Sequence, residues 1–446
     1  MKQVNLLTDS PRRLFFHYLG PTIGSSMVTS IYILADTIMV GQGVGDAGLA
    51  ALTIFMPIVA SFFALGLLLG VGGGVLMSVA KGSGNESLAH KYFSTAMISA
   101  AVVSVCFAVF GAIFFDPMMY ALGADTTNIE LVRGYGLCYT VSAPLFIFSS
   151  SLQSFIRNDK SPRHAMIAVL TGSGLNILLD YLFIFVFKMG MFGASFATSI
   201  GTSITVCILV IHFFTKKNTM RFSFRFFSIK ALWEIAKCGF SSFLIECANA
   251  VLVFVFNHTL LKYIGSVGVT VYSIMSNVAV VCMSLFNGVT LAAQPIIATN
   301  HGADNHKRVL QVQHIGTITS SVIAVIIFCV GFFFPDLLIY SYVKGPTPEI
   351  LELARYALRI YFFAYLFMNF NIFFSGYFQS TLRPVAAITI QILRSLLLSS
   401  VLVSVLPMIF GADAIWYAVP VTECITFFVA MAFLFFGRFQ KTKEVK

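Results

Sequence analysis

Residues 92–114 read YFSTAMISAAVVSVCFAVFGAIF, a run that contains no charged side chain. An α-helix needs about 20 predominantly apolar residues to cross a hydrocarbon core about 30 Å thick. This run is long and apolar enough to span a membrane, and similar runs recur along the whole chain. We expect twelve spans, at residues 16–40, 50–79, 92–114, 133–155, 164–187, 191–214, 238–263, 268–298, 311–334, 353–378, 385–409 and 414–437. The predicted fold class is an all-α membrane protein of twelve transmembrane helices.

The composition also indicates a membrane protein. Of the 446 residues, 58% are of hydrophobic type and only 10% are charged, against about 25% charged in a typical soluble domain. All eight cysteines lie in apolar spans without C-x-x-C spacing, so we expect neither a disulfide framework nor a zinc site. The sequence has no G-x-x-x-x-G-K-[ST] motif, which argues against nucleotide hydrolysis by a P-loop.

The net charge of +10 is explained by topology. Most of the 28 Lys and Arg residues fall in segments on one side of the membrane when the N-terminus is placed in the cytoplasm. The positive-inside rule then puts both termini in the cytoplasm. We therefore predict a multi-pass protein of the plasma (inner) membrane, in contact with lipid and without a nucleic-acid partner.

The chain looks like an internal duplication. The basic stretch 215–237 divides the spans into two sets of six, and short segments match at a separation of about 222 residues, such as 130–133 with 352–355 and Tyr139 with Tyr361. Because loop residues match in order, we favour duplication over chance similarity between apolar helices. We expect an N-terminal lobe (1–214), a cytoplasmic linker (215–237), a C-terminal lobe (238–437) and a cytoplasmic tail (438–446). An even number of spans in each half predicts a pseudo-two-fold axis along the membrane normal, with the substrate path between the lobes.

Carboxylates inside the spans mark the candidate site. A charge near the middle of a spanning helix costs roughly 2.5–3.5 kcal/mol, so each one needs a reason. Four qualify, namely Asp36, Asp180, Glu246 and Glu423. Asn176 lies four residues before Asp180 and so shares its helix face. Because burial favours the neutral form of a carboxyl group, Asp180 is suited to binding and releasing a cation, and a nearby Asp36 would titrate with it as a coupled pair.

This acidic site is expected in the first half alone. At separations of 218–222 residues, Asn176 and Asp180 correspond to positions among Leu396–Leu402, where the chain offers only Leu, Val and Ser. The structural alternative for Asp180 is a buried hydrogen bond between helices.

The other intramembrane residues leave more than one interpretation. Glu246 is compatible with a substrate site, with a second cation site or with a packing hydrogen bond. We interpret Glu423 as structural, with Arg394 as its partner. Pro21 removes a backbone donor inside the first span and should kink it, which makes Pro21 a candidate hinge; an ordinary packing kink is the alternative.

Several segments, in order along nearly the whole chain, resemble the multidrug and toxic-compound extrusion (MATE) family. They are LADTIMVG (34–41), QSFIRND (153–159) followed by Pro162, NILLD (176–180), MFGASFAT (191–198), and Gly288 with QP (294–295) and NHG (300–302). The resemblance implies two six-helix lobes. It also implies a secondary active antiporter that exports cationic or lipophilic organic compounds in exchange for H⁺ or Na⁺ by alternating access.

The resemblance also implies roles for particular residues. Asp36, Asn176, Asp180 and Thr198 would bind the coupling cation, as in prokaryotic members with an acidic site in the N-terminal lobe. Tyr32, Gln153, Glu246 and Gln294 are the candidate substrate-cavity residues. We expect a monomer without a cofactor, and no metal beyond Na⁺ at Asp36 and Asp180.

Three other functions were weighed against the antiporter. A flippase for lipid-linked oligosaccharides, from the same superfamily, would be expected to carry more basic groups in its cavity, whereas Arg394 is the main mid-span cation here. An intramembrane enzyme would need a nucleophile with its base, or a metal cluster; His301, Asp304 and His306 form the sole candidate. A passive channel would fail to transport uphill. We therefore expect a transporter and not an enzyme.

Overall fold

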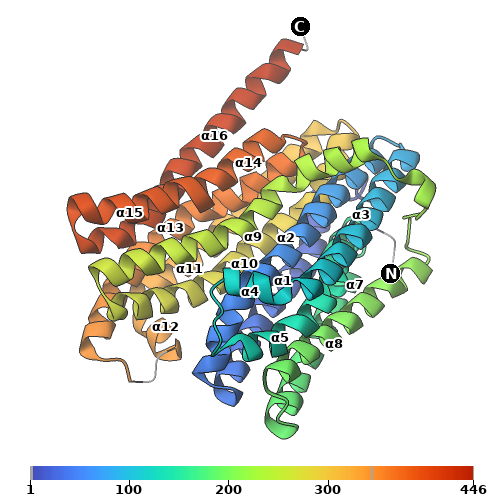
Figure 1. Cartoon of the computed structure of the whole chain (residues 1–446). Helices are drawn as coiled ribbons and strands as arrows, with labels where there is room; N and C mark the ends of the chain where they lie inside the picture. The colour runs from blue at the N-terminus through green and yellow to red at the C-terminus, as the bar shows by residue number, and fades with distance from the viewer. Residues whose placement is uncertain (1–3, 343–344, 445–446) are drawn as a thin grey trace. The chain divides into compact units, whose positions relative to one another are not determined.

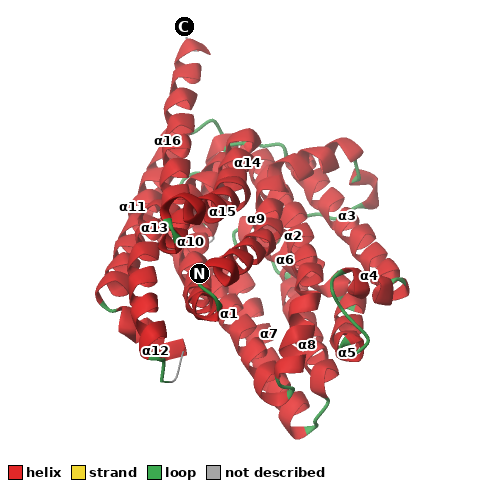
Figure 2. Ribbon diagram, turned by 60° about the vertical axis from the view of Figure 1, so that its left-hand side comes forward, coloured by secondary structure: helices red, strands yellow, loops and turns green. Residues whose placement is uncertain are grey.

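The computed structural model describes the backbone of residues 4–342 and 345–444, and within these the side chains of 249–250 and 437–444 are left out of the description. The described residues form helices and connecting turns, without a strand (Figures 1 and 2). Within them, eleven helices are long and apolar enough to cross a membrane, or twelve if one bent pair counts as a span. The predicted fold class, an all-α protein of about twelve spans, is confirmed.

Each expected span overlaps a helix of the structure. The first half contains α1 (Pro11–Gly43), α2 (Asp46–Gly82), α3 (Glu86–Ile113), α4 (Phe115–Ala121), α5 (Ile129–Val141), α6 (Ala143–Asn158), α7 (Pro162–Asp180), η1 (Tyr181–Val186), α8 (Gly190–Ile211) and η2 (His212–Phe214). After η3 (Phe224–Phe226), the second half contains α9 (Ile229–Tyr263), α10 (Ser266–Gly302), α11 (His306–Phe333), α12 (Pro335–Tyr342), α13 (Pro348–Ser380), α14 (Pro384–Ile392), η4 (Leu393–Leu397), α15 (Leu398–Phe410), η5 (Ala412–Tyr417) and α16 (Ala418–Glu444). Prolines open α1, α7, α13 and α14, where the missing N–H has no intrahelical partner to lose.

The fourth span is bent, which the sequence analysis did not anticipate. Residues 133–155 were expected as one helix, but α5 and α6 meet at an angle of 52°. Pro144 lies in the first turn of α6. Because its nitrogen carries no hydrogen, it cannot complete the hydrogen-bond ladder from α5, and the helix breaks there.

The backbone repeats between the two halves. Six described residues of the first half have a left-handed conformation, and all but Lys188 have a left-handed counterpart 220 to 222 residues later: Gly45 with Gly265, Gly84 with Asp304, Gly123 with Gly345, Lys160 with Leu382 and Gly190 with Gly411. Side chains follow the same pattern. Arg133 forms a two-pronged ion pair with Asp116, and Arg355 forms one with Asp336. Turns and ion pairs at matching positions support the duplication.

The chain folds into two compact units. One comprises Met1–Cys247 with Gln294–Val309, and the other Ala248–Ala293 with Leu310–Lys446. Parts of α9 and α10 therefore belong to the first unit. Glycines allow this packing: a Cβ on Gly302 of α10 would lie 2.0 Å from the carbonyl oxygen of Val79, and one on Gly82 would lie 2.0 Å from that of Thr299. The lobe boundaries expected from the sequence stay a prediction.

Residues 294–309 also hold the N-terminal segment. Asn300 Nδ2 donates to the Leu6 carbonyl at 3.0 Å, and Arg308 Nη2 donates to the carbonyls of Leu6 at 3.2 Å and Asp9 at 2.5 Å. Leu6 is buried. The segment before α1 is thus fixed by polar side chains from the second half of the sequence.

The expected linker and tail are partly helical. Helix α9 begins at Ile229, inside the stretch 215–237, and α16 continues to Glu444, through most of 438–446. The linker is also held down, because Ser94 Oγ accepts from the Ser223 backbone N–H at 3.1 Å and Thr95 Oγ1 donates to the Phe226 carbonyl at 3.3 Å.

Candidate functional site

Asp36 and Asp180 come together inside the first unit. Asp36 lies in the C-terminal part of α1, and Asp180 is the last residue of α7, where that helix passes into the π-helical turn η1. Such turns interrupt regular helices and are frequent at functional sites. Asp180 is fully buried, and its side chain interacts directly with that of Asp36. The sequence analysis had left the approach of Asp36 to Asp180 as a condition, and the structure supplies it.

The two carboxyl groups have few partners. Among the described residues, Asp36 Oδ1 and both carboxylate oxygens of Asp180 are buried without a hydrogen-bond donor. Ionised carboxylates can only accept hydrogen bonds, so two of them side by side repel each other. A proton on one of them, or a small cation between them, removes that repulsion. The pair therefore has the chemistry of a cation site.

Asn176 and Thr198 extend the site across a helix contact. Asn176 Nδ2 donates to Thr198 Oγ1 at 3.2 Å, and Thr198 Oγ1 in turn donates to the Ala194 carbonyl at 3.0 Å. Asn176 also lies one helical turn before Asp180 on α7, within electrostatic reach of its carboxyl group. The contact needs Gly201 on α8, because a Cβ there would lie 2.9 Å from the Asn176 Cβ. The four residues proposed for cation coupling are thus linked through α1, α7 and α8.

Three tyrosines surround the acidic pair. Tyr32 lies one turn before Asp36 on α1 and interacts electrostatically with both carboxyl groups. Tyr135 and Tyr139, from α5, lie close to Asp36 as well, and their rings stack with centroids 5.6 Å apart. The sequence analysis missed these two as site residues. Their signal was the spacing of four, which puts two polar aromatic rings on one face of a spanning helix.

The remaining candidate cavity residues are not joined to the acidic pair by the hydrogen bonds described. Gln153 Nε2 donates to Ser149 Oγ at 3.1 Å, within its own helix α6. Gln294 is buried on α10, in the portion that belongs to the first unit. Glu246 is half-buried on α9. Their roles stay predictions.

Pro21 lies within a continuous helix. α1 runs from Pro11 to Gly43, and Pro21 is buried in it. The hydroxyl of Thr22, the next residue, donates to the Tyr18 carbonyl at 3.0 Å and the Leu19 carbonyl at 3.1 Å. The hinge role of Pro21 stays a prediction.

Glu423 has the partner expected for it. Arg394 Nη2 and Nε donate to Glu423 Oε1 at 2.8 Å and 3.0 Å, and Asn371 Nδ2 donates to Oε2 at 2.7 Å. Both members of the ion pair are buried. The predicted pairing of Glu423 with Arg394 is therefore present, and its structural role stays a prediction.

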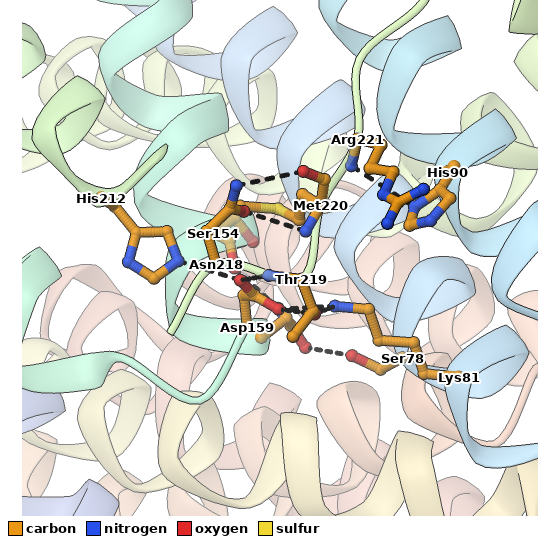
Figure 3. A network of polar contacts seen from close by, with 11 residues as sticks. Ser78, Lys81, His90, Ser154, Asp159, His212, Asn218, Thr219, Met220 and Arg221 are labelled. Atoms are coloured by element: carbon orange, nitrogen blue, oxygen red, sulfur yellow. Dashed lines mark hydrogen bonds and ion pairs between the residues drawn. The ribbon is translucent and has the colours of Figure 1, made fainter. Parts of the chain in front are cut away.

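A second polar centre was missed by the sequence analysis (Figure 3). Asp159, buried at the end of α6, is 2.6 Å from Lys81 Nζ and 2.9 Å from His212 Nε2, and it accepts from the Thr219 N–H at 3.0 Å and from the Thr219 hydroxyl. Burial raises the pKa of Asp159, but the hydrogen bond with His212 and the charge of Lys81 outweigh burial and lower the pKa to about 2. This network joins α2, α6 and α8 to the segment before α9. Among the described residues, no group of three or more His, Cys, Asp or Glu side chains could hold a metal ion.

Known proteins resemble this chain over nearly its full length. It matches the MatE family over residues 21–182 and 238–405. It is 25% identical to the multidrug export protein MepA of Staphylococcus haemolyticus, over 94% of this chain and 92% of that protein. It is 26% identical to MepA of Staphylococcus saprophyticus, over 96% and 94%. A solved structure described as the outward-facing conformation of a multidrug resistance MATE family transporter of the MOP superfamily shares the fold, with a TM-score of 0.91 and 21% identity over 99% of this chain and 98% of that one.

Proposed function

We propose that this chain, which belongs to the MatE family, is a secondary active transporter that exports cationic or lipophilic organic compounds in exchange for H⁺ or Na⁺. Membership of this family makes it a multi-pass membrane transporter and not an enzyme. The names of the MepA relatives, which export multiple drugs, support small organic molecules as its substrates. The direction of substrate transport and the identity of the coupling ion need an experimental test.

The observation that carries the proposal is the buried Asp36 and Asp180 pair. Three of its carboxylate oxygens lack a donor among the described residues, although charged groups inside a membrane are normally paired. A site that is unsatisfied when empty gains free energy by binding a proton or Na⁺. It can release that cation again once water reaches it from the other side.

Alternating access would join this cation site to substrate movement. Binding of the cation from outside favours one arrangement of α1, which carries Tyr32 and Asp36, and release inside favours another. Each positive charge that moves inward down a potential of 100 mV supplies about 2.3 kcal/mol. One charge per cycle therefore supports a concentration ratio of roughly 50-fold for an uncharged substrate. We place the protein in the plasma (inner) membrane as a monomer with both termini in the cytoplasm.

The test is dye uptake into inverted membrane vesicles. A fluorescent lipophilic cation is added, and a proton gradient or a sodium gradient is imposed in separate runs. We expect accumulation that follows one of the two gradients and that falls to the level of vesicles without the protein in Asp36→Asn and in Asp180→Asn. The matched control is Asp46→Asn, because Asp46 is an exposed carboxylate at the start of α2.

Two results would overturn the proposal. Full gradient-driven uptake in Asp180→Asn would remove the acidic pair from the mechanism. An absence of uptake with either gradient in the wild type would redirect the search to lipid-linked oligosaccharides as cargo.

A further inference from the structure

The second unit also contains a buried carboxylate with a polar environment. Glu423 on α16 and Arg394 on η4 are only 3% and 5% exposed. Besides the ion pair, Asn371 on α13 donates to Glu423 Oε2 at 2.7 Å and to the Glu423 carbonyl at 2.8 Å. The carboxylate is therefore held by side chains from two other elements of the same unit, η4 and α13.

Its surroundings share two kinds of residue, an asparagine and a tyrosine, with the acidic site of the first unit. Each carboxylate interacts with an Asn side chain, Asp180 with Asn176 and Glu423 with Asn371. In each half, a tyrosine of the fourth span also lies within electrostatic reach of a carboxylate: Tyr139 near Asp36 and Tyr361 near Glu423. These two tyrosines are the pair that matched in the sequence, 222 residues apart.

The two sites differ in whether a cationic side chain lies against the carboxylate. Among the described side chains, no cation pairs with Asp36 or Asp180 in the first unit, whereas a guanidinium lies against Glu423 in the second. An Arg side chain stays charged at every physiological pH, and its planar fork matches a carboxylate. Because it is covalently attached, it cannot be carried across the membrane and exchanged for another cation.

We propose that the second unit contains a cation site built like that of the first, and that the protein's own Arg394 guanidinium occupies it permanently. The second half then takes up no cation from solution, and the coupling charge of a transport cycle comes from the first half alone. The comparison of the two sites rests on the proposed function, but the occupancy by Arg394 can be tested without it.

The elements that carry this site also hold buried oxygens that lack a hydrogen-bond partner. Asn371 Oδ1, Gln391 Oε1 and Thr422 Oγ1 are buried without a partner among the described residues. Gln391 is tied to α13 through Ser375, to which its Nε2 donates at 3.0 Å. Carboxylate, amide and hydroxyl oxygens are the ligands that hard cations prefer. Removal of the guanidinium therefore leaves the Glu423 carboxylate, with Asn371 beside it, as a buried negative group without a counter-charge, suited to Na⁺ or a proton.

The experiment removes the first site and then opens the second. The parent carries Asp36→Asn and Asp180→Asn, so that its behaviour does not depend on whether those residues couple transport. Arg394→Met is added in one variant, and Arg394→Met with Glu423→Gln in another. The Tm of each purified protein is measured in NaCl and in choline chloride at equal ionic strength, over pH 5 to 8, and binding of radioactive Na⁺ is counted.

We expect Arg394→Met alone to respond. Its Tm should rise with Na⁺ or with falling pH, by several degrees more than that of the parent or of the Glu423→Gln variant, and any bound Na⁺ should disappear with Glu423→Gln. A folded Arg394→Met protein that ignores both Na⁺ and pH would overturn the proposal. If Arg394→Met folds poorly in choline chloride at pH 8, recovery in Na⁺ or at pH 5 supports the proposal. Failure under all conditions, while the Glu423→Gln variant folds, contradicts it.

Discussion

Replacement of Asp159 by Asn should destabilise the first unit by an amount that can be worked out from its surroundings. The carboxylate is fully buried and accepts from Lys81, His212 and Thr219. Its partners come from α2, from η2 at the end of α8, and from the segment that leads into α9. Asparagine keeps the shape but loses the charge, and its NH₂ group would face donors.

The magnitude follows from the pKa of Asp159. A value of about 2, against an ordinary value of 3.8, corresponds to stability on the order of 2 kcal/mol at neutral pH. Because the folded-state pKa is the lower of the two, this contribution is complete above about pH 4 and is lost as the pH falls towards 2. Asp159→Asn should therefore lower the free energy of unfolding by about 2 kcal/mol at pH 7, and by progressively less below pH 4.

The assay is denaturant unfolding of the purified protein in detergent micelles at a series of pH values. Lys81→Met and the double variant complete a cycle that isolates the coupling between the ammonium and the carboxylate. A loss below about 0.5 kcal/mol at pH 7, or a loss that is equally large at pH 3, would refute the assignment of Asp159 as an ionised anchor.

Two further predictions concern packing and charge in the rest of the fold. In the otherwise native protein, Arg394→Met should lower the free energy of unfolding by about 3–5 kcal/mol, because it leaves Glu423 buried without its counter-charge. Combining it with Glu423→Gln should recover most of that loss. Denaturant unfolding of the two variants measures both free energies. Gly302→Ala should lower the Tm, because its Cβ would lie 2.0 Å from the Val79 carbonyl oxygen and such overpacking costs about 1–3 kcal/mol of stability. Gly20→Ala is the control, since its Cβ would meet open space, and it should leave the Tm unchanged or raise it.

The spans were predictable because the membrane imposes a local rule of length and polarity that each segment obeys separately. The acidic residues were predictable for the same reason, since a charge in an apolar run is visible in the sequence alone. The bend at Pro144 was missed because the hydropathy of residues 133–155 is continuous, and hydropathy does not register the loss of one backbone donor.

Contacts between distant segments were beyond sequence reasoning. Lys81 and Asp159 are 78 residues apart, and His212 lies 53 residues beyond Asp159. Nothing local marks them as partners, since each sits at the end of an apolar run, where charged residues are ordinary. Tyr135 became part of the site only through the packing of α5 against α2 and α8. The pairing of Glu423 with Arg394 was predictable because both are rare, opposite charges at membrane depth.

The division of α9 and α10 between the two compact units has a consequence for biosynthesis. The first unit includes residues 294–309, and Asn300 and Arg308 from that stretch supply the donors for the carbonyls of Leu6 and Asp9. A ribosome that adds about 5–20 residues per second needs roughly 3 to 12 s to proceed from residue 248 to residue 309. During that interval the N-terminal segment has left the ribosome, but Asn300 and Arg308, its final partners, have not yet been synthesised. The first unit to be synthesised is therefore completed only after the second has begun to insert into the membrane.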